Sequence, residues 1–257
     1  MVNLPHVSIP TSRSLLTPTR LPSTPDCVVV IPTYNEHDTI LDLIGQVLEY
    51  PRCRVLVVDD NSPDGTGQLV ADYARHEARV AVLQRPRKLG LGTAYLDGFR
   101  WALAHDASLI CEMDADFSHD PAYLPYLIDN ADLCYDVVIG SRYVRGGATS
   151  DWGMLRQFIS RGGNAYANTI LRLPIHDSTS GFRCYRREVL ERIDLAAVRS
   201  NGYAFQIEMI YRARRAGFRI GEIPIIFPDR RVGNSKMSRQ IVIEAMINVW
   251  RLRFGLI

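Results

Sequence analysis

Between residues 27 and 141 the chain alternates short apolar segments with longer amphipathic ones, and this alternation constrains the fold more than any other feature. Five segments each contain a short apolar run, as buried strands do. They are CVVVIP (27–32), RVLVVDD (54–60), RVAVLQ (79–84), SLICEMDAD (108–116) and DVVIGS (136–141). The stretches between them, around 38–50, 68–76, 90–105 and after 121, indicate helices. The alternation predicts an α/β domain with a mainly parallel central sheet flanked by helices.

The sequence suggests three parts. Residues 1–26 are rich in Pro, Ser and Thr and lack the apolar core of a signal peptide, so we interpret them as a flexible leader. Residues 27–238 form the domain, whose second half, from about 142, is expected to be rich in helices and loops. Residues 239–257 combine apolar and basic side chains and predict a C-terminal amphipathic helix.

Charge and cysteine content exclude some classes of protein. Thirty Lys and Arg against 28 Asp and Glu leave a net charge of +2, which argues against a dedicated nucleic-acid-binding protein. This balance hides an asymmetry, because residues 1–140 carry 10 basic and 19 acidic side chains and residues 141–257 carry 20 and 9. The five cysteines are dispersed, as reduced thiols of a cytosolic protein are.

Acidic residues follow three of the predicted strands, where ligands of parallel sheets bind. Asp114 and Asp116 are separated by one residue, so their side chains share one side if the strand continues that far. Paired carboxylates repel one another unless a cation lies near them, and oxygen ligands favour Mg²⁺ or Mn²⁺. The alternative is a turn in which an Asp caps the next helix. Glu36 and Asp60 at neighbouring strand ends favour a nucleotide–metal site.

Two neighbouring motifs allow plainer interpretations. Asp60 comes directly from a buried strand, where a hydrogen bond to a ribose or a base would suit its carboxylate. Asp64 and Gly65, in DDNSPDGT, are typical of an ordinary turn. GLGTA (90–94) resembles a phosphate loop, but it lacks a third glycine and the Walker lysine, and glycines that pack a helix explain it equally well.

Taken together and in order, six motifs resemble those of the polyprenyl-phosphate (dolichol-phosphate) mannose synthases. These enzymes are inverting family 2 glycosyltransferases with the GT-A fold, a Rossmann-like α/β domain. The motifs are VVVIPTYNE, VLVVDDNSPDGT, KLGLGTAY, MDADFSHDP, GSRYVRGG and DRRVGNSK, and they extend from about residue 27 to 236. The resemblance implies a GDP-mannose donor, a polyprenyl monophosphate acceptor and a Mg²⁺ or Mn²⁺ cofactor.

The resemblance also assigns roles to residues by position. The residues that would bind the donor are Pro32, Tyr34, Glu36, Val58, Asp60, Asp114, Ala115, Asp116, Arg142, Arg230 and Lys236. The cation would be held by Asp114 and Asp116, and Ser118 stands where some members have a further metal contact, although a hydroxyl is a poorer ligand than a carboxylate. The acceptor phosphate would be bound by Arg142, Arg156 and Ser160.

The substrates indicate how such a reaction proceeds. A phosphate monoester has a second pKa of about 6, so the acceptor oxygen is already anionic and no general base is needed. The cation at Asp116 would stabilise the departing diphosphate, and Arg142 would hold the two phosphate-bearing substrates together, so these two residues are the catalytic candidates. Glu208 could be proposed as a base, but we favour a helical residue that orients nearby arginines. His119 and His176 are interpreted as structural or solvent-facing.

The lipid acceptor requires contact with a membrane, yet no apolar run approaches the roughly 18 residues of a spanning helix. Residues 239–257 could lie in the membrane interface or could pack on the domain. We therefore expect a peripheral protein at the cytoplasmic face, docked directly or through a separate membrane-anchoring protein. Two other functions remain open: a polyprenyl-phosphate glucosyltransferase that uses UDP-glucose, and a catalytically silent nucleotide-sugar-binding protein.

Overall fold

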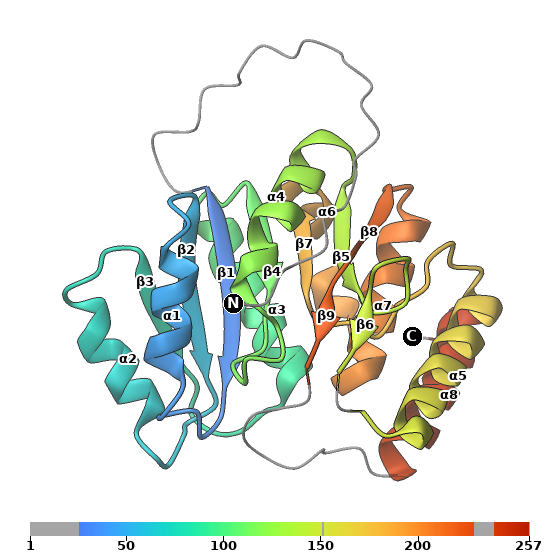
Figure 1. Ribbon diagram of the computed structural model, residues 1–257, viewed down its shortest axis with the longest axis horizontal. Helices are drawn as coiled ribbons and strands as arrows, with labels where there is room; N and C mark the ends of the chain where they lie inside the picture. Colours follow the sequence, from blue (N-terminus) through green and yellow to red (C-terminus); the bar gives the residue numbers. More distant parts are fainter. Residues whose placement is uncertain (1–25, 151, 229–238, 257) are drawn as a thin grey trace.

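A seven-stranded sheet lies at the centre of the computed structural model, which describes residues 26–150, 152–228 and 239–256 (Figure 1). Across the sheet the strands are β3 (Val80–Gln84), β2 (Cys53–Asp59), β1 (Cys27–Thr33), β4 (Leu109–Glu112), β7 (Arg183–Arg186), β5 (Val137–Ser141) and β8 (Ile220–Pro224). A separate pair consists of β6 (Ala148–Thr149) and β9 (Ile226–Phe227). Only β7 runs antiparallel to its neighbours in the seven-stranded sheet, so the predicted α/β class with a mainly parallel sheet is confirmed.

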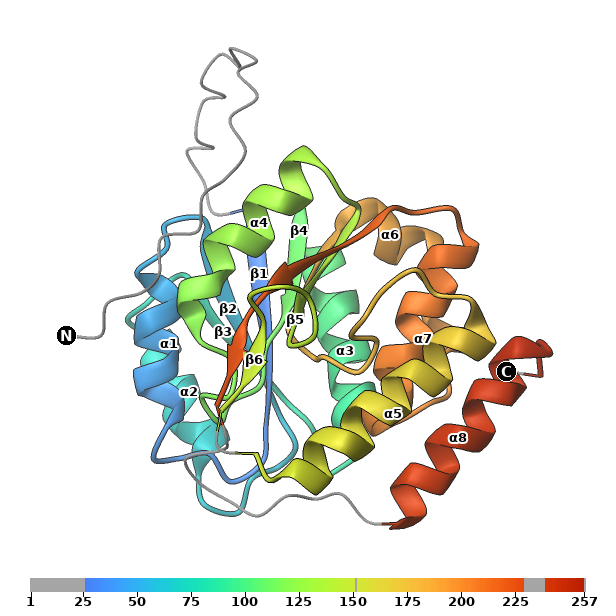
Figure 2. The ribbon, with the colours of Figure 1, turned by 45° about the vertical axis from the view of Figure 1, so that its right-hand side comes forward.

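Helices cover both faces of this sheet. They are α1 (Ile40–Leu48), α2 (Thr66–Ala74), α3 (Leu91–Ala104), α4 (Leu124–Leu133), α5 (Met154–Leu171), α6 (Arg187–Arg192), α7 (Gly202–Arg215) and α8 (Arg239–Arg253). Two short 3₁₀ turns, Pro121–Tyr123 and Leu195–Ala197, accompany them. Helices α5 and α8 lie side by side at one end of the molecule (Figures 1 and 2).

The apolar strands are buried on both sides, which explains why their sequences are continuous rather than alternating. In β1, Val29 and Ile31 pack into one core with α1, α2 and α4. Val28 and Val30 point to the opposite face and pack with α3, α5 and α7. Because successive side chains of a strand point to opposite faces, a single run of β-branched residues serves both cores.

The second half contributes more of the sheet than its sequence indicates. We expected helices and loops after residue 142, yet β7 and β8 both belong to the central sheet. Strand β7 is only four residues long and includes two arginines. Arg183 is nevertheless fully buried, because its guanidinium donates to the main-chain oxygens of Ser178, Ser180 and Gln206. Two of these acceptors lie in the preceding turn and the third, Gln206, belongs to α7, so the burial of Arg183 becomes apparent only in the folded chain.

Some expectations lie outside the described residues. The predicted leader does so except for Asp26, as do Arg230 and Lys236. The predicted C-terminal helix is present as α8. Within the described ranges, no helix is both long and apolar enough to cross a membrane.

Helix α3 approaches β1 closely at Gly98, which predicts an effect on stability. A Cβ atom there would lie well inside van der Waals contact with Cγ1 of Val30, whereas a Cβ atom at Gly45 in α1 would meet no atom within 4 Å. Gly98→Ala should therefore lower the free energy of unfolding by about 1–3 kcal/mol through overpacking. Gly45→Ala, the matched control, should raise it by up to about 1 kcal/mol through helix propensity. Chemical denaturation measures both, and equal effects would contradict the packing argument.

Candidate active site

The carboxyl ends of β1, β2 and β4 lie at one edge of the sheet and bring three of the motifs together. After β1, the main-chain N–H groups of Asn35, Glu36 and His37 donate to side chains of the loop after β2. Their acceptors are Ser62 Oγ, Thr66 Oγ1 and Asp64 Oδ2, each at 3.1 Å. In the parallel pairing of β1 with β2, Pro32 lies opposite Val58. The PTYNE and DDNSPDGT motifs therefore form one hydrogen-bonded rim.

Asp60 is buried and binds protein groups. One of its carboxylate oxygens accepts from the main-chain N–H groups of Leu89 and Gly90 at 3.2 and 3.1 Å. The other oxygen lies 2.8 Å from Nη1 of Arg85. The carboxylate thus fixes the loop that leads into α3, and the proposed contact with a ribose or base stays a prediction. On this loop the Lys88 ammonium lies 3.5 Å from the ring centroid of Tyr34, above the predicted nucleotide pocket.

Asp114 and Asp116 lie in a turn. Strand β4 ends at Glu112, so our premise that the strand continues to residue 116 is wrong. Phe117 in this turn has a left-handed backbone with φ of +59°, which breaks strand geometry. Asp114 Oδ1 accepts from the Tyr95 hydroxyl at 3.2 Å, and Asp116 Oδ1 accepts from the Ser118 N–H at 3.0 Å.

The donor atoms of this turn suit a hard divalent cation. The Asp114 side chain is 27% exposed, so water or a substrate can reach its carboxylate. Ser118 is almost fully buried, and its Oγ makes no hydrogen bond to the described part of the chain. In the described ranges no cluster of three His, Cys, Asp or Glu side chains could form a complete protein cage. Two carboxylates supplemented by substrate phosphates and water are typical of Mg²⁺ sites.

Beneath the turn lies a buried polar pair that the sequence did not indicate. Glu112 is fully buried at the end of β4, and its carboxyl accepts from Nε2 of Gln206 at 2.6 Å. Burial raises the pKa of Glu112 to about 7, against the opposing influence of Arg183. This pair links the end of β4, next to the turn of Asp114 and Asp116, to α7.

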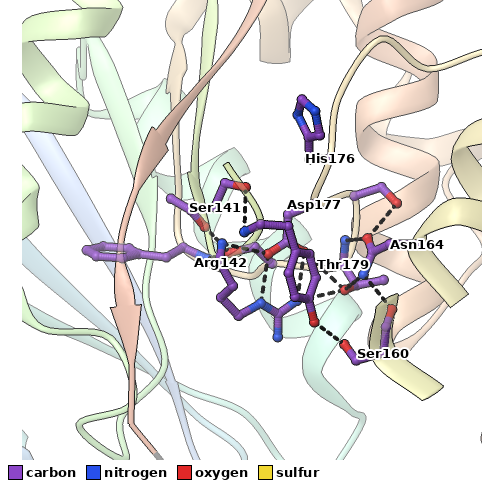
Figure 3. Close-up of polar contacts among 12 residues, drawn as sticks. Ser141, Arg142, Ser160, Asn164, His176, Asp177 and Thr179 are labelled. Carbon is purple, nitrogen blue, oxygen red and sulfur yellow. Dashed lines mark hydrogen bonds and ion pairs between the residues drawn. The ribbon is translucent and has the colours of Figure 1, made fainter. Parts of the chain in front are cut away.

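Arg142, at the end of β5, is bound by Asp177 in a buried ion pair (Figure 3). Its Nε and Nη2 donate to the two oxygens of Asp177, each at 2.7 Å, and Nη2 also donates to Thr179 Oγ1 at 2.8 Å. Asn164 of α5 donates to Thr179 Oγ1 and accepts from the Ser178 hydroxyl and the Thr179 N–H. The loop 177–179 therefore joins Arg142 to α5.

The ion pair also sets the charge states of both partners. Burial alone would raise the pKa of Asp177, but Arg142 outweighs it and holds that pKa below its usual range. Burial would likewise lower the pKa of Arg142, and Asp177 reverses this. Both groups are charged at neutral pH, and the pair has no net charge. The sequence interpretation did not include Asp177, which no motif spacing connects to Arg142.

A largely apolar pocket opens beside Arg142, between α5, α7 and α8. Its lining brings together all three predicted acceptor-phosphate residues, Arg142, Arg156 and Ser160. The Arg156 guanidinium lies 3.9 Å from the ring centroid of Trp152, and Ser160 Oγ accepts from the Tyr143 hydroxyl at 2.7 Å. The other lining residues are Trp152, Ile159, Gly163, Tyr166, Ala167, Thr179, Tyr203, Ile207, Met246 and Val249. A lining that combines two arginines with mainly apolar side chains suits an amphiphilic ligand.

Glu208 lies in the protein interior, where its carboxylate is hydrogen-bonded to protein groups and does not serve as a base. It is fully buried in α7, where Oε1 accepts from Nε of Arg212 at 2.7 Å. Its other oxygen accepts from the N–H groups of Arg199 and Ser200. The interpretation of Glu208 as a helical residue that orients an arginine is confirmed.

Comparison with known proteins identifies the family. The model for glycosyl transferase family 2 matches residues 28–194. The chain belongs to this family. It is 48% identical over 230 residues to a polyprenol monophosphomannose synthase of Mycolicibacterium smegmatis, covering 88% of this chain and 87% of the relative. An undecaprenyl-phosphate mannosyltransferase of Micrococcus luteus is 46% identical over 225 residues, covering 87% and 92%.

Solved structures support the same fold. Glucosyl-3-phosphoglycerate synthase from Mycobacterium tuberculosis, in complex with Mn²⁺ and UDP-glucose, has a TM-score of 0.65 at 19% identity, covering 89% of this chain and 79% of that one. A mannosyltransferase from Pyrobaculum calidifontis, in complex with GDP-Man and Mn²⁺, has a TM-score of 0.54 at 18% identity, covering 89% and 70%. The GT-A-like fold of this family 2 glycosyltransferase is thereby confirmed.

The Arg142–Asp177 pair predicts a distinctive response to mutation in this glycosyltransferase. Arg142→Ala leaves the Asp177 carboxylate buried without its cation, which should lower the free energy of unfolding by about 3–5 kcal/mol. The double variant Arg142→Met/Asp177→Leu removes both charges and should recover most of this loss. Urea denaturation at pH 7 measures all three proteins. A double variant as unstable as Arg142→Ala would contradict the proposed cost of the unpaired carboxylate.

Proposed function

We propose that this chain is an inverting mannosyltransferase that moves mannose from GDP-mannose to a polyprenyl monophosphate and forms polyprenyl-phosphate mannose. The observation that carries the proposal is the pocket beside Arg142. Its arginines suit a phosphate, its apolar walls suit an isoprenoid chain, and it belongs to a chain that is 48% identical to a polyprenol monophosphomannose synthase.

The donor is assigned to the edge formed by the ends of β1, β2 and β4. Pro32, Tyr34 and Glu36, with Val58 and Asp60, would surround the nucleoside. Asp114, Ala115 and Asp116 would hold the diphosphate and a Mg²⁺ or Mn²⁺ ion, with Ser118 beside them. When bound, such a cation supplies charge stabilisation to the departing GDP. Both structural neighbours described above contain Mn²⁺, which supports a divalent metal.

The acceptor is assigned to the pocket between α5, α7 and α8. Arg156 would bind the acceptor phosphate, and Asp177 offsets the charge of Arg142. Arg142 would then orient rather than attract the phosphate, with Ser160 as a further polar contact. The phosphate oxygen, already anionic, attacks the anomeric carbon while the bond to GDP breaks, so the sugar configuration inverts and no general base is needed.

Membrane contact is assigned to an exposed apolar patch that continues from this pocket. The patch consists of Met154, Leu155, Phe158 and Ile159 of α5, Met246, Ile247 and Trp250 of α8, and Phe254 directly after α8. The opposite side of α8 packs on the domain, where Val249 and Leu252 are buried. The two interpretations of this helix, packed and interfacial, are therefore compatible. Exposed Arg161, Arg251 and Arg253 on the same helices would attract anionic lipid.

This arrangement supports peripheral attachment at the cytoplasmic face of a membrane, with or without a separate anchoring protein. An alternative, UDP-glucose-dependent glucosyl transfer to the same acceptor, differs only in the donor. A second alternative, a catalytically silent nucleotide-sugar-binding protein, would bind the donor at the ends of β1, β2 and β4 but would transfer no sugar.

A transfer assay tests the proposed reaction. Incubated with GDP-mannose, polyprenyl phosphate and Mn²⁺, the protein should release GDP and move labelled mannose into the lipid fraction. EDTA should abolish this, and Asp116→Asn should lower kcat by about 100-fold or more because the leaving group loses its stabilisation. Turnover with UDP-glucose but not with GDP-mannose would contradict the donor assignment. Binding of the sugar nucleotide without any turnover would contradict the enzymatic function.

The membrane assignment is tested with vesicles containing anionic lipid. The triple variant Leu155→Ser/Phe158→Ser/Trp250→Ser should bind them at least about tenfold more weakly, because each large side chain contributes more than 1 kcal/mol when it leaves water. Tyr126→Ser/Leu133→Ser alters exposed apolar side chains of α4 instead and should bind like the unmodified protein. Equal binding by all three proteins in a flotation assay would contradict the assignment of the patch.

A further inference from the structure

His119, three residues after Asp116, is buried against the turn that carries the predicted metal ligands. Its side chain is only 1% exposed. The imidazole stacks on the ring of Phe182, with centroids 4.9 Å apart, and meets the edge of Phe227 at 5.5 Å. These contacts fix the plane of the ring without using either ring nitrogen.

The ring nitrogens face Asp114. The main-chain N–H of Asp114 donates to Nδ1 of His119 at 2.9 Å. Because a peptide N–H can only donate, Nδ1 carries no proton, and the neutral ring has its hydrogen on Nε2. Nε2 lies 4.0 Å from Asp114 Oδ2. One imidazole thus holds the backbone of Asp114 and faces its carboxylate.

Two further residues lie close to Asp114. Tyr95 donates to Oδ1 at 3.2 Å, and a Cβ atom at Gly181 would lie 3.6 Å from His119 Cε1 and 3.9 Å from Asp114 Oδ1. The left-handed Phe117 shows that this turn departs from regular geometry and needs support from its surroundings.

We propose that His119 is a positioning residue for the cation site, which acts by fixing the backbone and the carboxylate of Asp114 through an unprotonated Nδ1. The inference rests on the proposed assignment of Asp114 and Asp116 to a divalent cation. Groups that orient metal ligands in this way commonly change metal affinity 10–100-fold when they are removed.

Two substitutions separate the acceptor from the ring. Asn places an acceptor oxygen near the position of Nδ1 but has no ring, whereas Phe keeps the ring and loses the acceptor. In the full chain with GDP present, His119→Phe should weaken Mn²⁺ binding by about 10–100-fold, and His119→Asn should stay within about threefold of the unmodified protein. Electron paramagnetic resonance measures free Mn²⁺, and near-ultraviolet circular dichroism checks the fold.

The proposal is overturned if His119→Phe binds Mn²⁺ as tightly as the unmodified protein, since the acceptor would then be unnecessary. It is also overturned if both variants lose affinity equally, since an acceptor at the position of Nδ1 would then not preserve binding. If His119→Phe does not fold, His119→Asn decides, because retained Mn²⁺ binding supports the acceptor role and lost binding excludes it. Mn²⁺ binding does not require the acceptor lipid. An unmodified protein that binds Mn²⁺ but transfers no mannose would therefore contradict the proposed function and leave this inference intact.

Discussion

The buried ion pair between Arg142 and Asp177 holds the second half of the domain together. Arg142 ends β5, and Asp177 lies in the loop that leads to β7. The N–H groups of His176 and Asp177 in turn donate to Glu222 of β8. Through Thr179 and Asn164 the same loop fixes α5. Strands β5 and β8, helix α5 and the pocket beside Arg142 are thus connected through a pair with almost no exposed surface.

The near-neutral composition results from the cancellation of two differently charged halves. The acidic half provides the strand ends assigned to nucleotide and cation, and the basic half provides the arginines assigned to phosphates and lipid. Within the basic half, Asp177 offsets the charge of Arg142. A site of this kind can bring two anionic substrates together without holding the acceptor too tightly for turnover.

The sequence was most informative where local pattern decides the structure. Short apolar runs revealed β1 to β5, and the ordered motifs revealed the family. The pattern failed at β7, because this strand is short and contains two arginines, and the burial of Arg183 depends on the turn before it and on Gln206 of α7. It also missed Asp177 and the orientation of His119, since both are defined by contacts that only the folded chain creates. Asp60 was expected to serve a ligand, yet in the structure its carboxylate is used by the loop before α3.

The position of β7 has a consequence for how the chain folds. This strand separates β4 from β5 in the sheet, although its residues follow those of β5 by more than 40 positions. During synthesis β4 therefore presents an open edge, and β5 cannot join the sheet, until residue 186 has left the ribosome. Exposed strand edges promote wrong pairing, and non-local strand pairs form slowly. The interval between β5 and β7 is thus the period in which the nascent chain is most exposed to aggregation, and chaperone binding would protect it most effectively there.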